Sequence, residues 1–182
     1  MRYLGEVDKM PETKSPNIEC MPTGDKDKKK GFTFLCVVDD SEELSRAVRF
    51  SCRRAERVGG NVALVYVIQP AEFQHWMSVG DLMREEARQE AEDLMMGVAK
   101  GVQDCSGLTP EIYIREGNTT EELIKLIDEE KSISLLVLGA AAGDDGPGPL
   151  VSYFMEKAAG KLRVPITVVP GNLSNEEIDS IT

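Results

Sequence analysis

Residues 32–38 read Phe-Thr-Phe-Leu-Cys-Val-Val, and Asp39, Asp40 and Ser41 follow at once. A near-continuous apolar run of this length is typical of a β-strand that is covered on both faces, as in a parallel sheet between two layers of helices. The polar residues after it offer side-chain oxygens to the free amides of a helix start. This stretch therefore predicts a buried strand that leads directly into a helix.

The same alternation of apolar strand and amphipathic helix continues along the chain. After the helix that ends at Gly59 and Gly60, we predict strands at 61–68, 109–115, 134–138 and 165–169, and helices at 81–104, from Thr119 or Thr120 to 127, and at 150–162. Short connections and right-handed crossovers between such elements give an open parallel sheet with helices on both faces. The predicted fold class is thus α/β, with five strands.

Composition divides the 182 residues into one domain and two flanking segments. Residues 1–30 contain several prolines and the run Asp-Lys-Asp-Lys-Lys-Lys, with little apolar periodicity, and we predict a disordered or extended arm. Residues 31–170 carry the strand and helix patterns and form the predicted domain. Residues 171–182 are predicted to be an acidic tail.

Charge and cysteine content narrow the classes of partner. The net charge of −11 opposes a phosphate backbone, so we expect no nucleic-acid partner. No apolar run is long enough to span a membrane or to act as a secretion signal, so we expect no membrane association. The four cysteines form no Cys-x-x-Cys pair, which favours reduced thiols and a cytoplasmic location.

A ligand site is expected where the order of a parallel sheet reverses, beyond the carboxyl ends of the strands. For strand order 3-2-1-4-5 this point lies between the first and fourth strands, next to Asp39 and to the glycine-rich loop 139–149. The free amides at the start of the following helix would attract a phosphate, whereas Asp144 and Asp145 would repel it unless Mg²⁺ is present. A flexible connection between strand and helix is the alternative for this loop.

Catalytic motifs are absent. No Gly-Lys-Ser/Thr follows the glycines, and no Gly-x-Gly-x-x-Gly follows the first strand. His75 is the only histidine, and its irregular segment favours a role in a lid or in surface packing over one as a general base. We therefore expect neither a catalytic residue nor a metal site, and predict that the chain is not an enzyme.

The successive blocks Val-Val-Asp-Asp-Ser, residues 61–68, Ser134–Gly139 and Leu150–Pro170 resemble, in order, those of the universal stress protein family. The resemblance implies an adenine nucleotide alpha hydrolase-like fold. In ATP-binding members the loop reads Gly, two residues, Gly, nine residues, Gly and Ser or Thr. Here Gly139 matches the first glycine. Ala142 stands at the position of the second glycine, with Gly143 one place later, and Ser152-Tyr153 stands where Gly and Ser or Thr are expected.

By this resemblance, Asp39 and Val67 would lie at the adenine end, and Gly139 would lie beside the ribose and phosphates. The full set of candidate nucleotide-binding residues is Asp39, Asp40, Ser41, Val67, Leu138, Gly139, Gly143, Ser152 and Tyr153. We predict a stress or signalling protein that responds to ATP or AMP, with Mg²⁺ where needed. It is expected to form a homodimer through the last strand, at Ile166 and Val168. The alternative is a ligand-independent interaction or protective protein of the same fold that has lost ATP binding.

Overall fold

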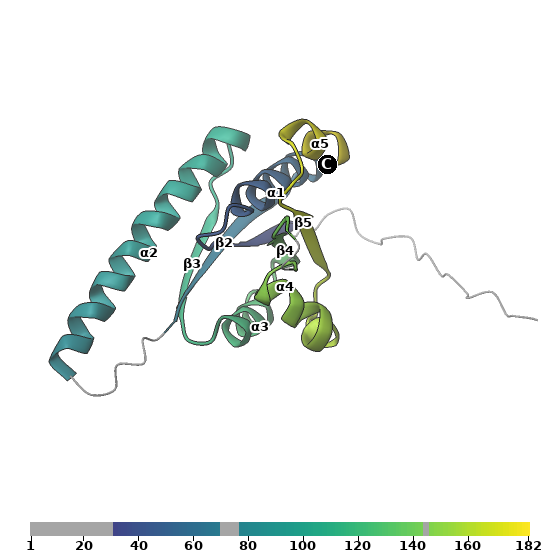
Figure 1. Ribbon diagram of the computed structural model, residues 1–182. Helices are drawn as coiled ribbons and strands as arrows, with labels where there is room; N and C mark the ends of the chain where they lie inside the picture. The colour runs from purple at the N-terminus through teal and green to yellow at the C-terminus, as the bar shows by residue number, and fades with distance from the viewer. Residues whose placement is uncertain (1–30, 70–76, 144–145) are drawn as a thin grey trace, which may run out of the picture.

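Five parallel strands form one sheet in the order β3-β2-β1-β4-β5 (Figure 1). The structure is a computed structural model that describes residues 31–69, 77–143 and 146–182. The strands are β1 (Thr33–Val37), β2 (Asn61–Ile68), β3 (Glu111–Glu116), β4 (Ile133–Ala140) and β5 (Ile166–Pro170). Every neighbouring pair runs parallel, and β1 pairs with both β2 and β4. The predicted fold class and strand order are confirmed.

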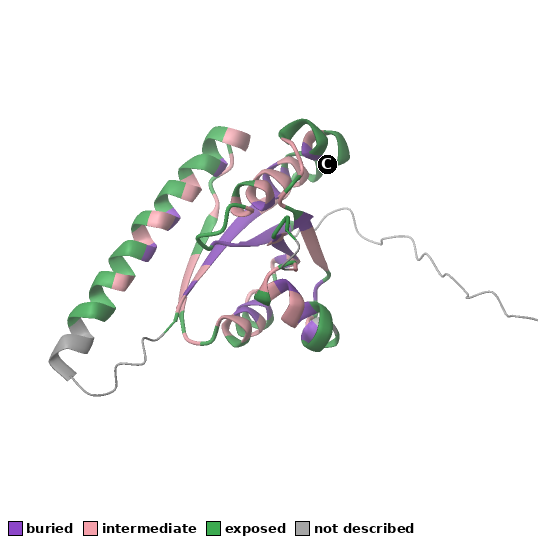
Figure 2. Ribbon diagram, in the orientation of Figure 1, coloured by how far each residue is buried: buried purple, intermediate pink, exposed green. Residues whose placement is uncertain are grey.

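Side chains of β1 point alternately into two separate hydrophobic clusters, one on each face of the sheet. Leu35 and Val37 join a cluster that includes α3 (Thr119–Glu129) and α4 (Pro149–Tyr153). Phe34 and Cys36 join a cluster that includes α1 (Leu44–Val58) and α2 (Met77–Ser106). Figure 2 shows the buried residues concentrated along the central strands, between these helical layers. This two-sided cover explains why the strand sequence is apolar without alternation.

Several predicted boundaries were wrong at the element ends. The helix α2 is longer at both ends than the predicted 81–104, and β3 begins at Glu111. The single helix predicted at 150–162 is instead α4, a π-helical turn at Phe154–Ala158 and a 3₁₀ turn at Ala159–Lys161. Phe154 and Ala158 are nevertheless buried. The four-residue spacing thus identified the buried side chains but not the change in helical pitch.

The two predicted helix caps also differ from the structure. No side chain caps the amino end of α1, because Asp39 instead accepts bonds from the amide and hydroxyl of Ser41, at 3.0 and 2.5 Å. For α3 the cap is Asn118 rather than a threonine, and its side-chain oxygen accepts from the amides of Thr120 and Glu121. In both turns a short Asp or Asn side chain bonds backbone two or three residues ahead.

The last residues form a short helix, α5 (Asn175–Ile181), that packs against α1 (Figure 1). The Asp179 carboxylate accepts hydrogen bonds from Nε and Nη2 of Arg49, at 2.9 and 2.5 Å, and from Nε of Arg53 at 3.2 Å. Three other arginines of α1 donate to oxygens of this segment: Arg46, Arg54 and Arg57. Residues 171–182 are therefore acidic, as predicted, but they are not merely a tail.

This contact fixes the protonation state of Asp179. The Arg49 guanidinium, with a smaller contribution from Arg53, lowers the pKa of the Asp179 carboxyl below its ordinary value of 3.8. A carboxyl whose pKa is lowered by folding stabilises the folded state above its ordinary pKa, and that contribution is lost as the pH falls through the lowered value. The α1–α5 contact is thus intact at neutral pH and weakens only in acid.

In the described parts of the chain, no helix is long and apolar enough to cross a membrane. The arm predicted at 1–30 lies outside the described residues, as do His75 and the pair Asp144 and Asp145, so those predictions stay predictions.

We predict that Ile178→Ala lowers the free energy of unfolding by about 2–4 kcal/mol, because a fully buried aliphatic side chain leaves a cavity when truncated. The matched control is Ile181→Ala in the same helix, where the side chain is 60% exposed and the expected loss is below about 0.5 kcal/mol. Urea denaturation followed by circular dichroism measures both. Equal, small effects would show that α5 does not dock.

Candidate functional site

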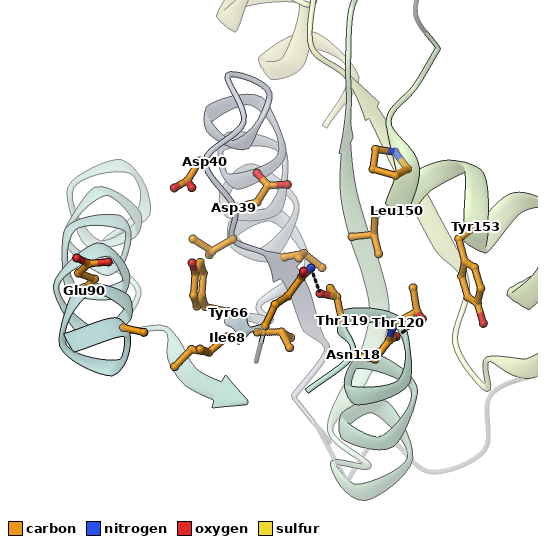
Figure 3. Close-up of a pocket in the computed structure, with 16 residues that line it drawn as sticks. Asp39, Asp40, Tyr66, Ile68, Glu90, Asn118, Thr119, Thr120, Leu150 and Tyr153 are labelled. Atoms are coloured by element: carbon orange, nitrogen blue, oxygen red, sulfur yellow. Dashed lines mark hydrogen bonds between the residues drawn. The ribbon is translucent and has the colours of Figure 1, made fainter. Parts of the chain in front are cut away.

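Two adjoining cavities lie at the carboxyl ends of the central strands. The larger, of about 730 Å³, is bounded by the ends of β1 and β2, by α2, by the start of α3 and by α4 (Figure 3). Its lining consists of Val37, Val38, Asp39, Asp40, Tyr66, Val67, Ile68, Gln69, Ala87, Glu90, Asn118, Thr119, Thr120, Pro149, Leu150 and Tyr153. A volume of this size is within the range of small-molecule and cofactor sites.

The smaller cavity, of about 250 Å³, lies between the ends of β1 and β4. It is lined by the start of α1 and by both ends of the glycine-rich loop. Val37, Asp39, Pro149 and Leu150 line both cavities, so the two adjoin, and together they are called the crevice. Because β1 and β4 are neighbours, this crevice is at the point where the strand order reverses, as predicted.

The polar side chains of the larger cavity come from several different elements. In Figure 3, Asp39 and Asp40 lie on one side, Glu90 of α2 lies on another, and Asn118, Thr119 and Thr120 lie at the start of α3. Gln69 donates to the Thr119 hydroxyl at 3.2 Å, which ties the end of β2 to α3. The floor between these groups is apolar. A ligand with a flat apolar body and polar edges would meet both kinds of surface here.

The electrostatic character of the crevice is acidic. Asp39, Asp40 and Glu90 line the larger cavity, Asp39 and Glu43 line the smaller, and no described residue lining either cavity is Lys or Arg. Burial, and then the carboxylates of Asp40, Glu90 and Asp39, raise the pKa of the Tyr66 hydroxyl. Within the described segments, no group of three or more His, Cys, Asp or Glu side chains is arranged to hold a metal ion.

The structure places most of the sequence-predicted residues at this crevice. Asp39, Asp40, Val67 and Tyr153 line the larger cavity, while Ser41, Leu138 and Gly139 line the smaller. Gly143 and Ser152 line neither. The amide of Ser152 donates to the Gly148 carbonyl at 3.1 Å and is therefore already paired within the turn.

The sequence-based prediction did not include several lining residues: Tyr66, Glu90, Asn118, Thr119 and Leu150. Asn118 and the threonines had a usable signal, because they follow a strand end and should lie at the same edge of the sheet as Asp39. Glu90 had none. It reaches the crevice only because α2 lies alongside β2, a tertiary contact that the helical pattern does not encode.

Gly139 has a packing role that is independent of any ligand. A Cβ at this position would lie 2.9 Å from Glu43 Cβ and 3.2 Å from the Glu43 carbonyl oxygen. Gly171 is tight against the same residue, with Glu43 Cγ at 2.5 Å from its would-be Cβ. The start of α1 thus rests directly on the ends of β4 and β5, and glycine is needed there for close approach.

Five parallel strands in this order, with helices on both faces and a crevice at the switch point, make this an open doubly wound α/β fold. Residues 32–170 match the model of the Universal stress protein family, and the chain belongs to that family. The resemblance drawn from the sequence is confirmed.

Individual relatives agree with this assignment. A universal stress protein of Mycolicibacterium smegmatis is 28% identical over 150 residues, which are 78% of this chain and 49% of that protein, so the chain spans about half of that relative's length. The structure is similar to UspA of Lactobacillus plantarum, with a TM-score of 0.64 and 19% identity over 76% of this chain and 97% of that one. It is also similar to an Archaeoglobus fulgidus universal stress protein solved in complex with dAMP, with a TM-score of 0.55 and 16% identity over 76% and 97% of the two chains.

Gly139 in β4 and Gly143 in the loop after it provide a matched test of this close packing. We predict that Gly139→Ala lowers the free energy of unfolding by about 1–3 kcal/mol, because the new methyl group overlaps Glu43. In Gly143→Ala nothing lies within 4 Å of the new methyl group, and the expected change is within about 0.5 kcal/mol. Chemical denaturation measures the free energy of unfolding of both variants. If Gly139→Ala is as stable as the parent protein, Gly139 is not needed for close packing against Glu43.

Proposed function

We propose that this chain is a nucleotide-responsive stress or signalling protein that binds an adenine nucleotide in the crevice between β1 and β4. The observation that carries the proposal is that two adjoining cavities, which share Asp39 and Leu150 as lining residues, lie at the switch point of the sheet. The dAMP complex of the Archaeoglobus relative supports the same class of ligand. No catalytic residue is part of the proposal, which assigns binding and signalling rather than chemistry to this site.

The larger cavity suits the base and the smaller suits the phosphate. Val67 and Tyr66 offer apolar surface at the inner end of the larger cavity, while Asn118 and Thr119 offer polar groups at its rim. Asp39 stands between the cavities, where a ribose joins base to phosphate. Gly139 lines the smaller cavity, in agreement with the ribose and phosphate position that the family resemblance implies.

Charge favours a nucleotide with few phosphates. Asp39 and Glu43 line the smaller cavity without a described lysine or arginine, so each added phosphate increases the repulsion. Mg²⁺ bound to a di- or triphosphate would offset these charges, and carboxylate oxygens are ligands that Mg²⁺ accepts. We therefore propose AMP as the preferred free nucleotide, and ATP as a ligand only with Mg²⁺.

A ligand-independent interaction protein is the second candidate. It is favoured by the paired amide of Ser152 and by the position of Gly143 outside both cavities, since these residues stand where the family's phosphate contacts are expected. Both candidates place the protein in the cytoplasm. The free thiols of Cys36, Cys52 and Cys105 are those expected in a reducing compartment.

We further propose a homodimer that forms through β5. This strand is at the edge of the sheet, and it pairs only with β4 among the described strands. Ile166 and Val168 are only partly buried although they pack against the core of the α3 and α4 face. An edge strand with apolar side chains and free backbone groups is a surface that a second copy can extend or cover.

For the nucleotide site, we predict that AMP binds more tightly than ATP without divalent cations, and that Mg²⁺ raises the affinity for ATP by about tenfold or more. Leu150→Trp should abolish AMP binding, because Leu150 lines both cavities and the larger indole would occupy space that the nucleotide needs. Titration calorimetry measures each affinity.

The control is Met155→Trp, a neighbouring exposed position that lines neither cavity and should bind AMP like the parent protein. Thermal melts establish that both variants are folded. If neither AMP nor Mg²⁺-ATP binds the parent protein at millimolar concentration, nucleotide binding is rejected and the ligand-independent function remains.

For the dimer, we predict that the parent protein sediments at micromolar concentration with the coefficient expected for a dimer. Val168→Lys should sediment as a monomer, because a charge on an edge strand opposes pairing. Leu82→Lys, at an exposed position of α2, is the control and should remain dimeric. A monomeric parent protein, or dissociation by both substitutions alike, excludes the β5 interface.

A further inference from the structure

Three cysteines lie in one cluster on the α1 and α2 face of the sheet, away from the crevice. Cys36 of β1 and Cys52 of α1 are fully buried, and Cys105 near the end of α2 is packed against the same cluster. All three are free thiols. Burial raises the pKa of the Cys52 thiol to about 12, and the neighbouring Cys105 thiol adds to the rise by charge and by hydrogen bonding. Cys52 of α1 and Cys105 of α2 thus belong to one cluster, and their thiols interact.

Only Cys105 of this pair is open to small solutes. It is half-buried, and it lines a separate cavity of about 490 Å³ between α1, α2 and the start of α5. Val48 and Val98 form apolar parts of this cavity, while Arg46 and Arg49 supply positive charge. A molecule the size of a peroxide can therefore reach Cys105 from solvent, whereas Cys52 is fully buried and does not line this cavity.

Two arginine side chains lie near Cys105. Arg53 donates to the Cys105 carbonyl oxygen at 3.4 Å, and Arg49 lines the same cavity as Cys105. The carboxylates that pair with these arginines are Asp179 and Glu56. Reactive cysteines are typically partly exposed and lie near basic side chains, and Cys105 meets both conditions.

We propose that Cys105 and Cys52 form a peroxide-sensitive thiol pair, with Cys105 as the residue that is oxidised and Cys52 as the residue that resolves it. The pair is independent of nucleotide binding. Cys36 is not part of the proposed pair, because it is fully buried in β1 and does not line the cavity that reaches Cys105.

The reaction has two steps. In the first, the Cys105 thiolate attacks one oxygen of the peroxide, the O–O bond breaks and the departing hydroxide takes a proton to become water; the sulfur is oxidised to a sulfenic acid by two electrons. In the second, the Cys52 sulfur attacks the Cys105 sulfur, the S–O bond breaks, and the Cys52 thiol proton leaves with the hydroxide as water. Two thiols and one peroxide give one disulfide and two waters.

The product would join the middle of α1 to the end of α2. Cys52 and Cys105 pack in one cluster from two helices, and a disulfide requires that their Cα atoms lie within about 7 Å of each other. The two helices already pack together, and Ser51, beside Cys52, bonds the Ala47 carbonyl within α1. The disulfide would close a loop that includes β2 and most of α2, and so would restrict the motion of α2 relative to the sheet.

The test treats the reduced full-length chain with about one equivalent of hydrogen peroxide, then blocks free thiols and maps the peptides by mass spectrometry. We expect a Cys52–Cys105 cross-linked peptide, the loss of two free thiols per chain and reversal by dithiothreitol. In Cys52→Ala, we expect a sulfenic acid at Cys105 that dimedone traps. In Cys105→Ser, we expect Cys52 to remain reduced.

A disulfide that joins Cys105 only to Cys20 or to another chain would overturn the assignment of Cys52. If Cys105 stays reduced in tenfold excess peroxide, the thiol pair is rejected. The role of the arginines has its own measurement. Arg53→Gln should slow the oxidation of Cys105 by about tenfold, whereas Arg57→Gln, which contacts α5 but not Cys105, should leave the rate unchanged. Equal rates in both variants would remove the arginines from the proposal.

Discussion

The pairing of β1 with both β2 and β4 is the constraint on which the rest of the structure depends. The chain leaves β1 toward one face of the sheet and leaves β4 toward the other, since α1 belongs to one hydrophobic cluster and α4 to the opposite one. The segments that follow the two strands therefore diverge. The crevice lies where these two segments separate, beside Asp39.

This divergence also explains the tight packing around Glu43. The first turn of α1 must cross over the end of β4 to reach its own face, and Gly139 and Gly171 leave room for its backbone and side chain. The glycine at 139 is thus required by the fold whether or not a phosphate approaches it. A retained glycine in this loop is weaker support for nucleotide binding than its resemblance to the family loop implies, and the stronger support is the shape of the crevice.

The sequence was sufficient for features that depend on local pattern. The apolar runs at 32–38 and 134–138 identified central strands, and the order expected for a doubly wound sheet agrees with the structure. The start of α5 also had a local signal, because Ser174 and Glu177 form a capping box. Its docking did not, since a helix this short is stabilised by distant contacts: Arg49 and Arg53 bind Asp179, and Ile178 is buried. Glu90 reaches the crevice for the same kind of reason.

The site residues divide along the same line. Asp39 follows β1 and Gly139 lies at the carboxyl end of β4, so their place at the sheet edge follows from the pattern, and both line the crevice. Ser152 was positioned by counting along a loop. Counting assumes that the loop follows the family's path, but Gly146 and Gly148 adopt positive φ angles and the Ser152 amide closes onto Gly148. Spacing therefore identifies residues at strand ends more securely than residues beyond a glycine-rich turn.

Helix α1 is the element where the separate features of this protein meet. Its first turn borders the crevice through Glu43 and Leu44, its buried face carries Cys52, and its outer face holds α5 through a row of arginines. The proposed disulfide at Cys52 would act on the same helix whose start forms one wall of the crevice. Arg49 and Arg53 of this helix hold Asp179 of α5, and Arg53 also reaches the Cys105 carbonyl oxygen. The crevice, the proposed thiol pair and the carboxyl-terminal helix are thus connected through one helix.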